Sequence, residues 1–482
     1  MKNVQGIQRA APLSRAGILA AAVLLLSGCA TFSKDGGLDA VQQMVRENAG
    51  KDVVVARTLE EQETLAGRVA GLLKKTLDVE DAVQIALLNN QGIQASLQEL
   101  GIAEADRVQA GRLPNPHFTF SRSRGGLDSA SSVEQALSFN VFSLVVIPLA
   151  TQVEKRRFAR TQNQVALEVL RLAADTRKAY FVAVATEESL RYMRQVRTAA
   201  EASAELARRM EQVGNWSKLS RMREQAFYAD AALRLAHAEK AAVTAREQLI
   251  RLMGLWGKDI AFQLPERLPD LPNAADELPD VEGRAMERRL DLRMVRLDAE
   301  AQARNLGLTR VTRFVNVLEF GVAREREKGY DEDIATRKTY EISFELPIFD
   351  FGTTRLARAE AVYTQVLNRA AQAAVNARSE VREAYRGYRA NYDIARHYRD
   401  EIVPLRKRIA DENLLRYNGM LIGVFELLAD ARSQILSVNS SIEALRDFWI
   451  ARADLDMALI GKPSIATMQG ATASQAEAQG GH

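Results

Sequence analysis

Apolar and polar residues alternate in four short stretches of the chain. The clearest stretch covers residues 340–346, where every second residue is aromatic or aliphatic and the residues between are Glu or Ser. The others cover residues 118–121, 138–141 and 318–323. A period of two predicts β-strands, and one apolar face opposite a polar face suits strands that lie between lipid and water. Strands of a small soluble sheet would not explain why acidic residues recur on one face only.

Polar segments separate these strands pairwise, at residues 122–132 and 324–338, and the second segment is densely charged with both signs. Segments of this kind typically join neighbouring strands. The sequence therefore predicts two β-hairpins, within residues 117–142 and 314–346.

Two much longer stretches predict helices. Residues 153–212 and 355–417 are rich in Ala, Arg, Glu, Gln and Leu, and Gly387 is the only glycine in them. These residue types have high helix propensity, and about 60 residues at 1.5 Å per residue span roughly 90 Å. We expect two helices too long for a compact domain, the second kinked at Pro404. A cytosolic coiled coil would contain such helices but not the predicted strands.

The same landmarks occur twice along the chain in the same order. Helical segments open at Val79 and at Val281, and Pro148 and Pro347 each precede a long helix. The offset between the two series is about 200 residues. This order predicts an internal duplication.

Each long helix is followed by a short interruption. Gly214 with Asn215 interrupts the first helical pattern, and Asn418 with Gly419 interrupts the second. Glycine and asparagine commonly end helices. We therefore expect these residues to form the tips of two helical hairpins.

The first residues are typical of a secretory signal peptide. Lys2, Arg9 and Arg15 are basic, and the apolar residues 17–26 are too few to span a bilayer. The sequence Leu-Ser-Gly-Cys that ends at Cys29 resembles a bacterial lipobox. That resemblance implies cleavage before Cys29, with diacylglycerol on its sulfur and an N-acyl chain on its amino group. A free thiol after an ordinary signal is the alternative.

Six segments follow from these landmarks. Residues 1–28 form the signal peptide, and residues 29–76 form an N-terminal anchor or equatorial segment. Each of the two repeats contains a helix, a β-hairpin and a long helical hairpin. Repeat 1 covers residues 77–258 and repeat 2 covers residues 278–463, with a proline-rich linker at 259–277 between them. Residues 464–482 form an expected disordered tail.

Charge and hydropathy narrow the classes of function. The chain has 65 Lys and Arg and 62 Asp and Glu, and removal of residues 1–28 leaves 62 of each sign. This balance gives no basic face for nucleic acid. After Cys29 there is no apolar stretch of about 18 residues, so a membrane crossing would be made by strands.

The chain offers little material for catalysis. Its four histidines are far apart in sequence, and Cys29 is its only cysteine. Its glycines match neither a Walker nor a dinucleotide-binding pattern. We expect no enzymatic activity, no metal site, and no cofactor other than the covalent lipid on Cys29.

Four strands are too few to close a barrel, and an open sheet edge in hydrocarbon leaves backbone groups unpaired at several kcal/mol each. Two chains would give eight strands around a filled interior, whereas three would give twelve strands around a lumen. The predicted fold class is an α+β membrane protein. It is a trimeric 12-stranded β-barrel with four strands per chain, continued by a long α-helical barrel and built from two tandem repeats.

Several segments together resemble the TolC-like outer-membrane factors, in particular the lipoprotein branch that serves multidrug and heavy-metal pumps. The resemblance covers residues 77–463. It departs in the first half, where no glycine follows Pro148. Besides the lipobox, it is carried in this order by residues 113–116, 346–352, 417–419 and 425–431.

The resemblance implies a homotrimer in the bacterial outer membrane, anchored by lipid and extending into the periplasm. Its tips at Gly214, Asn215, Asn418 and Gly419 would contact a periplasmic adaptor protein joined to an inner-membrane RND-type pump. The implied function is a passive exit duct of a tripartite efflux system. The exit duct of a type I protein secretion system is the alternative on the same architecture. A periplasmic enzyme or a soluble helical scaffold is the third possibility.

Two carboxylates lie shortly after the second tip. Glu426 and Asp430 are four residues apart and share a helical face. Threefold symmetry would turn each into a ring at the periplasmic mouth, where it would select cations. Pairing with Arg416 or Tyr417 would hold the mouth shut. Ordinary solvated charges are the alternative.

Overall fold

The computed structural model describes residues 31–56, 58–124, 131–314, 317–328 and 334–463, which form two compact units. Unit 1 contains the residues up to Gly37 together with Glu99–Gln162 and Val295–Ala370. Unit 2 contains Leu38–Gln98, Asn163–Met294 and the residues from Ala371 onward. The strands belong to unit 1, and the tips of the helical hairpins belong to unit 2.

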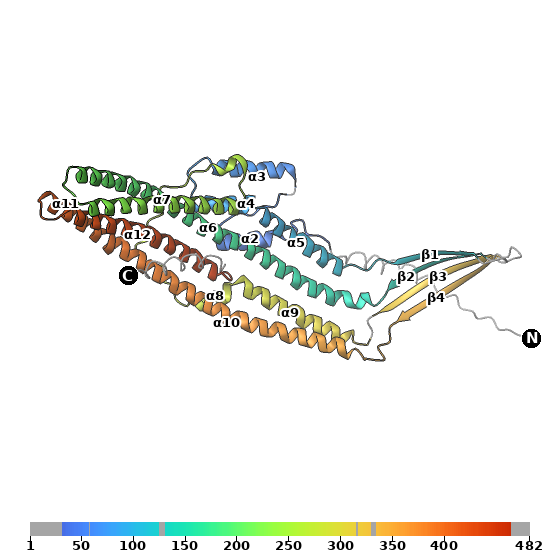
Figure 1. Cartoon of the computed structure of the whole chain (residues 1–482). Helices are drawn as coiled ribbons and strands as arrows, with labels where there is room; N and C mark the ends of the chain where they lie inside the picture. Colours follow the sequence, from blue (N-terminus) through green and yellow to red (C-terminus); the bar gives the residue numbers. More distant parts are fainter. Residues whose placement is uncertain (1–30, 57, 125–130, 315–316, 329–333, 464–482) are drawn as a thin grey trace, which may run out of the picture. The chain divides into compact units, whose positions relative to one another are not determined.

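Unit 1 contains one antiparallel sheet of four strands in the order β1-β2-β3-β4 (Figure 1). The central pair joins the two repeats, because β2 and β3 are hydrogen-bonded although a long helical hairpin separates them in the chain. The predicted four strands are confirmed. Their bounds are β1 His117–Arg124, β2 Ser131–Asn140, β3 Leu318–Lys328 and β4 Ile334–Phe344.

The two faces of this sheet differ in polarity. The register places Phe320 between Phe139 and Ile342, so one row across three strands is apolar. The rings of Phe139 and Phe320 meet edge to face, with 6.2 Å between their centroids. The opposite face carries Glu319 and Glu341, each one residue removed from an apolar position. The predicted alternation is confirmed across the sheet.

The strands extend further than the sequence predicts. Both ends of the expected connection 324–338 belong to strands, because β3 continues to Lys328 and β4 begins at Ile334. The register pairs Glu325 with Arg337, and their charged atoms lie 3.9 Å apart. Opposite charges directly across an antiparallel pair stabilise it. The dense charge that suggests a loop is thus compatible with a strand whose side chains are exposed.

The first long helix, α6 (Ser143–Gln212), begins earlier than residue 153, where the sequence predicts its start, and Pro148 lies inside it. The N–H of Ser143 donates to the Asn140 side-chain oxygen (3.3 Å), so Asn140 supports the start of the helix. Pro148 is the sixth residue of the helix, so α6 lacks one backbone hydrogen bond in its second turn, because proline has no N–H to donate. The prediction that Pro148 precedes the helix is wrong.

The second long helix is interrupted where the sequence predicts a kink. It consists of α10 (Thr353–His397), a π-helical segment (Tyr398–Ile402) and α11 (Val403–Asn418), with Pro404 in the first turn of α11. The Val403 N–H donates to the Tyr398 carbonyl, five residues back. A π segment directly before a proline is a recognised way to break the regular hydrogen-bond series.

Two helices in each repeat precede the strands. Asp78 caps α4 by accepting from the Asp81 N–H (2.7 Å), and Asp280 caps α8 by accepting from the Gly283 N–H (3.1 Å). The helices thus begin at Val79 and Val281, where the sequence places them. The remaining helices are α2 Leu38–Ala49, α3 Leu59–Leu72, α4 Val79–Asn89, α5 Gln91–Ala110, α7 Lys218–Met253, α8 Val281–Arg288, α9 Leu290–Val311 and α12 Val424–Ala458, with a 3-10 turn at Gly257–Ile260.

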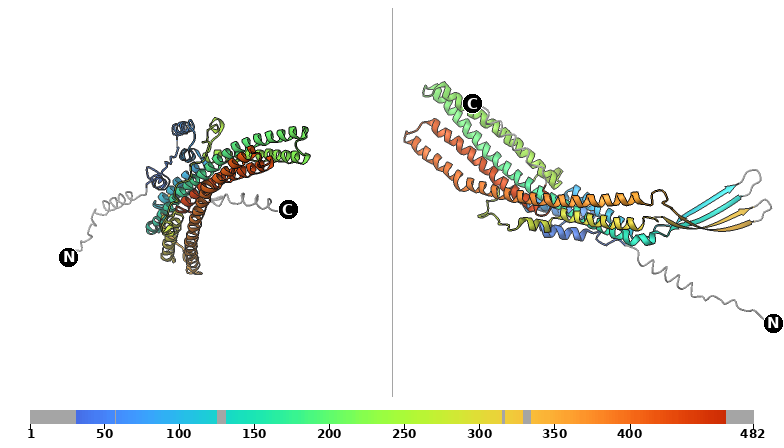
Figure 2. Two further views of the ribbon diagram at one scale, coloured as in Figure 1. Left: turned by 90° about the vertical axis from the view of Figure 1, so that its left-hand side faces the viewer. Right: turned by 90° about the horizontal axis from the view of Figure 1, so that it is seen from below.

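The two helical hairpins, α6 with α7 and α11 with α12, lie side by side with their tips at the same end of unit 2 (Figures 1 and 2). A chain of aromatic contacts joins the repeats further along. Phe181 of α6 stacks on Trp449 of α12, Trp449 meets Phe448, and Phe448 meets Tyr388 of α10, with centroid distances of 5.3, 5.1 and 5.6 Å. Tyr388 and Phe448 are fully buried. These aromatic contacts therefore link the separate hydrophobic clusters of the two repeats.

Candidate functional sites

The sheet has two edges at which the described part of the chain places no further strand. Among these residues, β1 pairs only with β2, and β4 pairs only with β3. Every residue of β1 and β4 is exposed, including Tyr340 at 70% and Ile342 at 66%. An edge strand presents unpaired backbone groups, and exposed aromatic and aliphatic side chains add an apolar surface. The unpaired backbone groups therefore require a further strand at each edge, and the apolar surface requires a surrounding other than water.

The first hairpin tip is a Schellman turn at the end of α6. The Gly214 N–H donates to the Glu211 carbonyl and the Asn215 N–H donates to the Met210 carbonyl, each at 2.9 Å. Gly214 has φ 78°, in the left-handed region where glycine avoids the clash of a Cβ. The structure thus places Gly214 and Asn215 at this tip.

The second tip has the same turn with a different residue in the strained position. The Met420 N–H donates to Tyr417, and the Leu421 N–H donates to Arg416, each at 2.9 Å. Met420 has φ 58°, whereas Gly419 has an ordinary φ of −79°. Met420 is thus the counterpart of Gly214. A non-glycine residue in this conformation costs about 1–2 kcal/mol. The side chains of Met420 and Leu421 are 93% and 78% exposed.

The charged residues near the second tip make contacts within the hairpin. Arg416 pairs with Glu412 of its own helix at 3.2 Å, and not with Glu426 or Asp430. Asp430 accepts a hydrogen bond from the Asn413 side-chain amide, which joins α11 to α12. Glu426 is exposed. The predicted pairing of Arg416 with these carboxylates is therefore not made within one chain.

Behind the tips lies an ion pair between a buried carboxylate and a partly exposed arginine, which the sequence does not predict. Glu224 of α7 is 1% exposed and lies 2.8 Å from the Arg432 guanidinium of α12. It also accepts from the Ser203 hydroxyl of α6 (2.8 Å), and Arg432 lies over the Phe227 ring at 4.2 Å. In the sequence Glu224 resembles any solvated helix carboxylate, so no local signal identifies it. The pair connects the hairpin of repeat 1 to that of repeat 2.

The residues that follow the predicted lipid-attachment site lie against α5. Cys29 itself lies outside the described residues. Ser33 donates from its N–H (2.7 Å) and its hydroxyl (2.6 Å) to Glu104, which also pairs with Arg107 at 2.9 Å. Burial raises the pKa of Glu104, but the bonds from Ser33 and Arg107 outweigh it and hold that pKa below its usual value. The chain is thus fixed four residues after Cys29.

Within the described ranges, we find no group of three or more His, Cys, Asp or Glu side chains placed to hold a metal ion. The helices in the same part of the chain include none that combines the length and apolar character of a membrane span.

No protein-family model matches the chain, and no curated protein matches it in sequence. Solved structures do. The Campylobacter jejuni CmeC outer membrane channel covers 87% of this chain and 91% of its own, at 15% identity and a TM-score of 0.64. The Neisseria gonorrhoeae MtrE outer membrane channel in its open state covers 80% and 89%, at 19% identity and 0.65. The Vibrio cholerae outer membrane protein VceC covers 80% and 97%, at 14% identity and 0.65.

The chain has the fold of these outer-membrane channels. The resemblance to TolC-like outer-membrane factors is thus confirmed for the fold.

Proposed function

We propose that the chain is one subunit of an outer-membrane channel, the passive exit duct of a tripartite efflux system. The observation that carries the proposal is the sheet of unit 1, with its two open edges and its apolar face exposed. The likeness in fold to outer-membrane channels supports it. Lipid would cover the apolar face, and copies of the same chain would cover the edges.

The number of strands favours a homotrimer. Closure requires that β1 of one copy pair with β4 of the next. Three copies give a twelve-stranded barrel wide enough for a lumen, whereas two give an eight-stranded barrel filled by side chains. The α-helices would continue this barrel as a helical tube through the periplasm.

The mass of the purified protein in detergent, measured by light scattering, tests this closure. We expect three times the mass of one mature chain. A monomer or a dimer would refute the shared barrel.

A pair of neighbouring substitutions tests the assignment of the sheet faces. Ile342→Lys places a charge on the apolar face, and Ser343→Lys places the same charge on the polar face. A lysine facing lipid costs about 2–4 kcal/mol at mid-membrane. We expect the first variant to reach the outer membrane in much smaller amounts than the second, as measured in membrane fractions. Equal amounts of the two variants in the outer membrane would contradict the proposal that this face contacts lipid.

Anchoring by lipid on Cys29 belongs to the same proposal, with delivery to the outer membrane. Cys29→Ser should abolish labelling by a fatty-acid analogue, because the sulfur is the attachment point. We expect the variant still to form trimers when it is given a cleavable signal, since the barrel itself holds the protein in the membrane. Undiminished labelling would contradict the lipid anchor.

The helical tips are the proposed contact with a periplasmic adaptor of an inner-membrane RND-type pump. Gly214, Asn215, Asn418 and Gly419 lie at these tips, beside the exposed side chain of Met420. A photo-crosslinking amino acid at position 420 should capture the adaptor in cells. An ATP-driven exporter encoded beside this protein, in place of an RND-type pump and adaptor, would favour protein secretion on the same architecture.

Glu426 and Asp430 are the proposed charged rings of the periplasmic mouth, with Arg416 and Tyr417 as partners between chains. Replacing both carboxylates by Ala should raise single-channel conductance in planar bilayers and lower cation selectivity. Asn413→Ala is the matched control, because it breaks the hydrogen bond to Asp430 and keeps the charge. If Asn413→Ala reproduces the full effect, the effect arises from contacts between the helices and not from the charges. Unchanged conductance and selectivity in the double variant would refute the proposed charged rings.

A further inference from the structure

The apolar face of the sheet becomes basic along the strands. Successive residues of a strand lie on opposite faces, and residues directly opposite one another in the register share a face. Phe320 marks the apolar face. On β3 this face continues with Val322, Arg324 and Arg326, so charged side chains follow the apolar ones.

The charges of the four strands are sorted by face. The apolar face carries six basic side chains and, within these strands, no acidic one. This basic belt consists of Arg122 and Arg124 of β1, Arg324, Arg326 and Lys328 of β3, and Lys338 of β4. The opposite face carries all five Glu residues of the strands and one arginine, Arg337, which lies 3.9 Å from Glu325. A surface that only faced water would have no reason to separate the two signs.

The basic belt lies toward the ends of the strands that are farther from the helices (Figure 1). Arg124 ends β1, which follows α5, and Lys328 ends β3, which follows α9. Arg324 is four residues beyond Phe320, which is about 13 Å along a strand. A basic side chain on a lipid-facing strand is costly at mid-membrane but nearly neutral at the membrane surface. If lipid covers the apolar rows, the belt therefore lies where the hydrocarbon ends.

Two cations of the belt lie directly opposite each other. Arg324 of β3 is the register partner of Lys338 of β4, and like charges in this position destabilise a strand pair. Arg324 and Arg326 are exposed, whereas Glu325 between them on the other face is partly buried. An anion between Arg324 and Lys338 would replace their repulsion by two attractive contacts.

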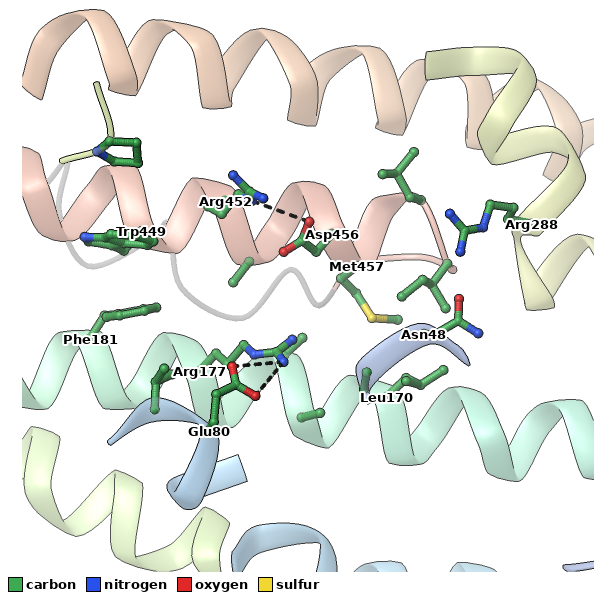
Figure 3. Close-up of a pocket in the computed structure, with 18 residues that line it drawn as sticks. Asn48, Glu80, Leu170, Arg177, Phe181, Arg288, Trp449, Arg452, Asp456 and Met457 are labelled. Carbon is green, nitrogen blue, oxygen red and sulfur yellow. Dashed lines mark hydrogen bonds and ion pairs between the residues drawn. The ribbon is translucent and has the colours of Figure 1, made fainter. Parts of the chain in front are cut away.

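Charges in unit 2 are arranged differently. In the cavity between α6 and α12, Arg177 lies 3.3 Å from Glu80, and Arg452 lies 3.6 Å from Asp456 (Figure 3). These cations have carboxylate partners in the same chain. The strands offer Arg324 and Lys338 no carboxylate on their own face, so a counter-charge for this pair would come from the surroundings.

We propose that the basic belt binds the phosphate groups of lipids in the outer leaflet of the membrane. The inference rests on the proposed function, which places the apolar face in lipid and the far ends of the strands toward the exterior. Arginine and lysine can keep their stems on apolar surface while their charged ends reach the headgroups. A guanidinium binds phosphate through two parallel N–H donors. A lipid with more than one phosphate can contact neighbouring cations of the belt at once.

The test titrates the full-length trimer in a neutral maltoside detergent with diphosphoryl lipid A and counts the bound lipid by native mass spectrometry. We expect binding at least about tenfold tighter than that of phosphatidylcholine, because each basic residue near a negatively charged headgroup contributes about fivefold. Monophosphoryl lipid A, which lacks one phosphate, should bind about fivefold more weakly than the diphosphoryl form. Inorganic phosphate at constant ionic strength should not displace the lipid.

Two arginines at the same level of the sheet provide a matched comparison. Arg324 faces the belt side, and Arg337 lies on the opposite face in the neighbouring register pair. Arg324→Gln should weaken lipid A binding about fivefold, and Arg324→Gln combined with Lys338→Gln about twentyfold. Arg337→Gln removes the same charge and should change binding less than about twofold. All of these side chains are exposed, so we expect each variant to remain trimeric.

Several outcomes would overturn the inference alone. They are equal affinity for lipid A and phosphatidylcholine, equal losses in Arg324→Gln and Arg337→Gln, and displacement of the lipid by inorganic phosphate. In each case a parent protein that stays in phosphatidylcholine vesicles as a trimer would leave the proposed channel intact. A parent protein that does not stay in such vesicles would refute the proposed function, and this inference with it.

Discussion

The two repeats close the ends of their helical hairpins with different chemistry at equivalent places. In repeat 1, Asn90 follows α4 and donates to the Leu252 carbonyl at the end of α7 (2.9 Å). In repeat 2, Arg289 follows α8 and donates to the Ala458 carbonyl at the end of α12 (3.4 Å). A neutral amide in one repeat and a buried cation in the other thus each donate to an otherwise unpaired carbonyl in the last turn of the second hairpin helix.

The difference lies in what each solution requires around it. Arg289 is 2% exposed and lies 2.6 Å from Asp291 and 2.7 Å from Glu380. Burial lowers the pKa of Arg289, but these two carboxylates more than compensate and raise it above its usual value, so the guanidinium stays charged. Asn90 needs no such companions. A duplicated fold therefore preserves the hydrogen bond while the residue that supplies it changes.

The largest expected effect comes from removing the buried cation. Arg289→Ala leaves two carboxylates without their partner, and we expect a loss of about 4 kcal/mol in the free energy of unfolding. Asn90→Ala removes neutral hydrogen bonds only, so its loss should be about 1–2 kcal/mol. Urea titration followed by circular dichroism measures both. Equal losses would show that the two solutions carry the same energetic weight, which would contradict this comparison.

The repeats also differ where the strands meet the long helices. In repeat 2 the turn before α10 contains Phe351 at φ 47° and Gly352 at φ 66°. A Cβ on Gly352 would lie 2.4 Å from the Arg313 carbonyl oxygen. In repeat 1 the chain passes from Asn140 directly into α6, and the described residues between them include no positive φ. This explains why no glycine follows Pro148.

Gly352→Ala tests the second of these junctions. The strained φ and the backbone clash together should cost about 3 kcal/mol of unfolding free energy. Gly387→Ala is the control, because Gly387 lies inside α10 and a Cβ there meets nothing within 4 Å. That control should gain about 0.5–1 kcal/mol. A neutral Gly352→Ala would show that the turn relaxes easily and that the two junctions do not differ in strain.

The smallest effects concern the two tips. Gly214→Ala forces a Cβ into a left-handed position, so it should lose about 1 kcal/mol, whereas Met420→Gly relieves the same strain and should gain about as much. Gly419→Ala should change little, because Gly419 has an ordinary φ and the nearest contact of a Cβ is 3.5 Å. Thermal unfolding of the three variants gives the order of their stabilities. A large loss of stability in Gly419→Ala would show that Gly419, and not Met420, adopts the left-handed conformation.

Local patterns in the sequence are enough to predict the strands, the long helices and the duplication. Alternation predicts the four strands, since the side-chain period of a strand is two whatever its neighbours are. Helix propensity and the near absence of glycine predict the two long helices. Pro404 predicts the interruption of the second one, because a proline removes a backbone donor wherever it lies. The repeated order of these signals predicts the duplication.

Which charges are buried and which residues are strained depends instead on how the helices pack. Glu224 and Arg432 are 208 residues apart, and only the packing of α7 on α12 brings them together. Arg288 and Arg289 are adjacent arginines in the sequence, yet Arg288 is exposed and Arg289 is buried between two carboxylates. Met420 takes the left-handed position although a glycine precedes it, because the hydrogen bonds of the turn fix which residue must reverse the chain. Such choices depend on long-range contacts, and these leave no local pattern in the sequence.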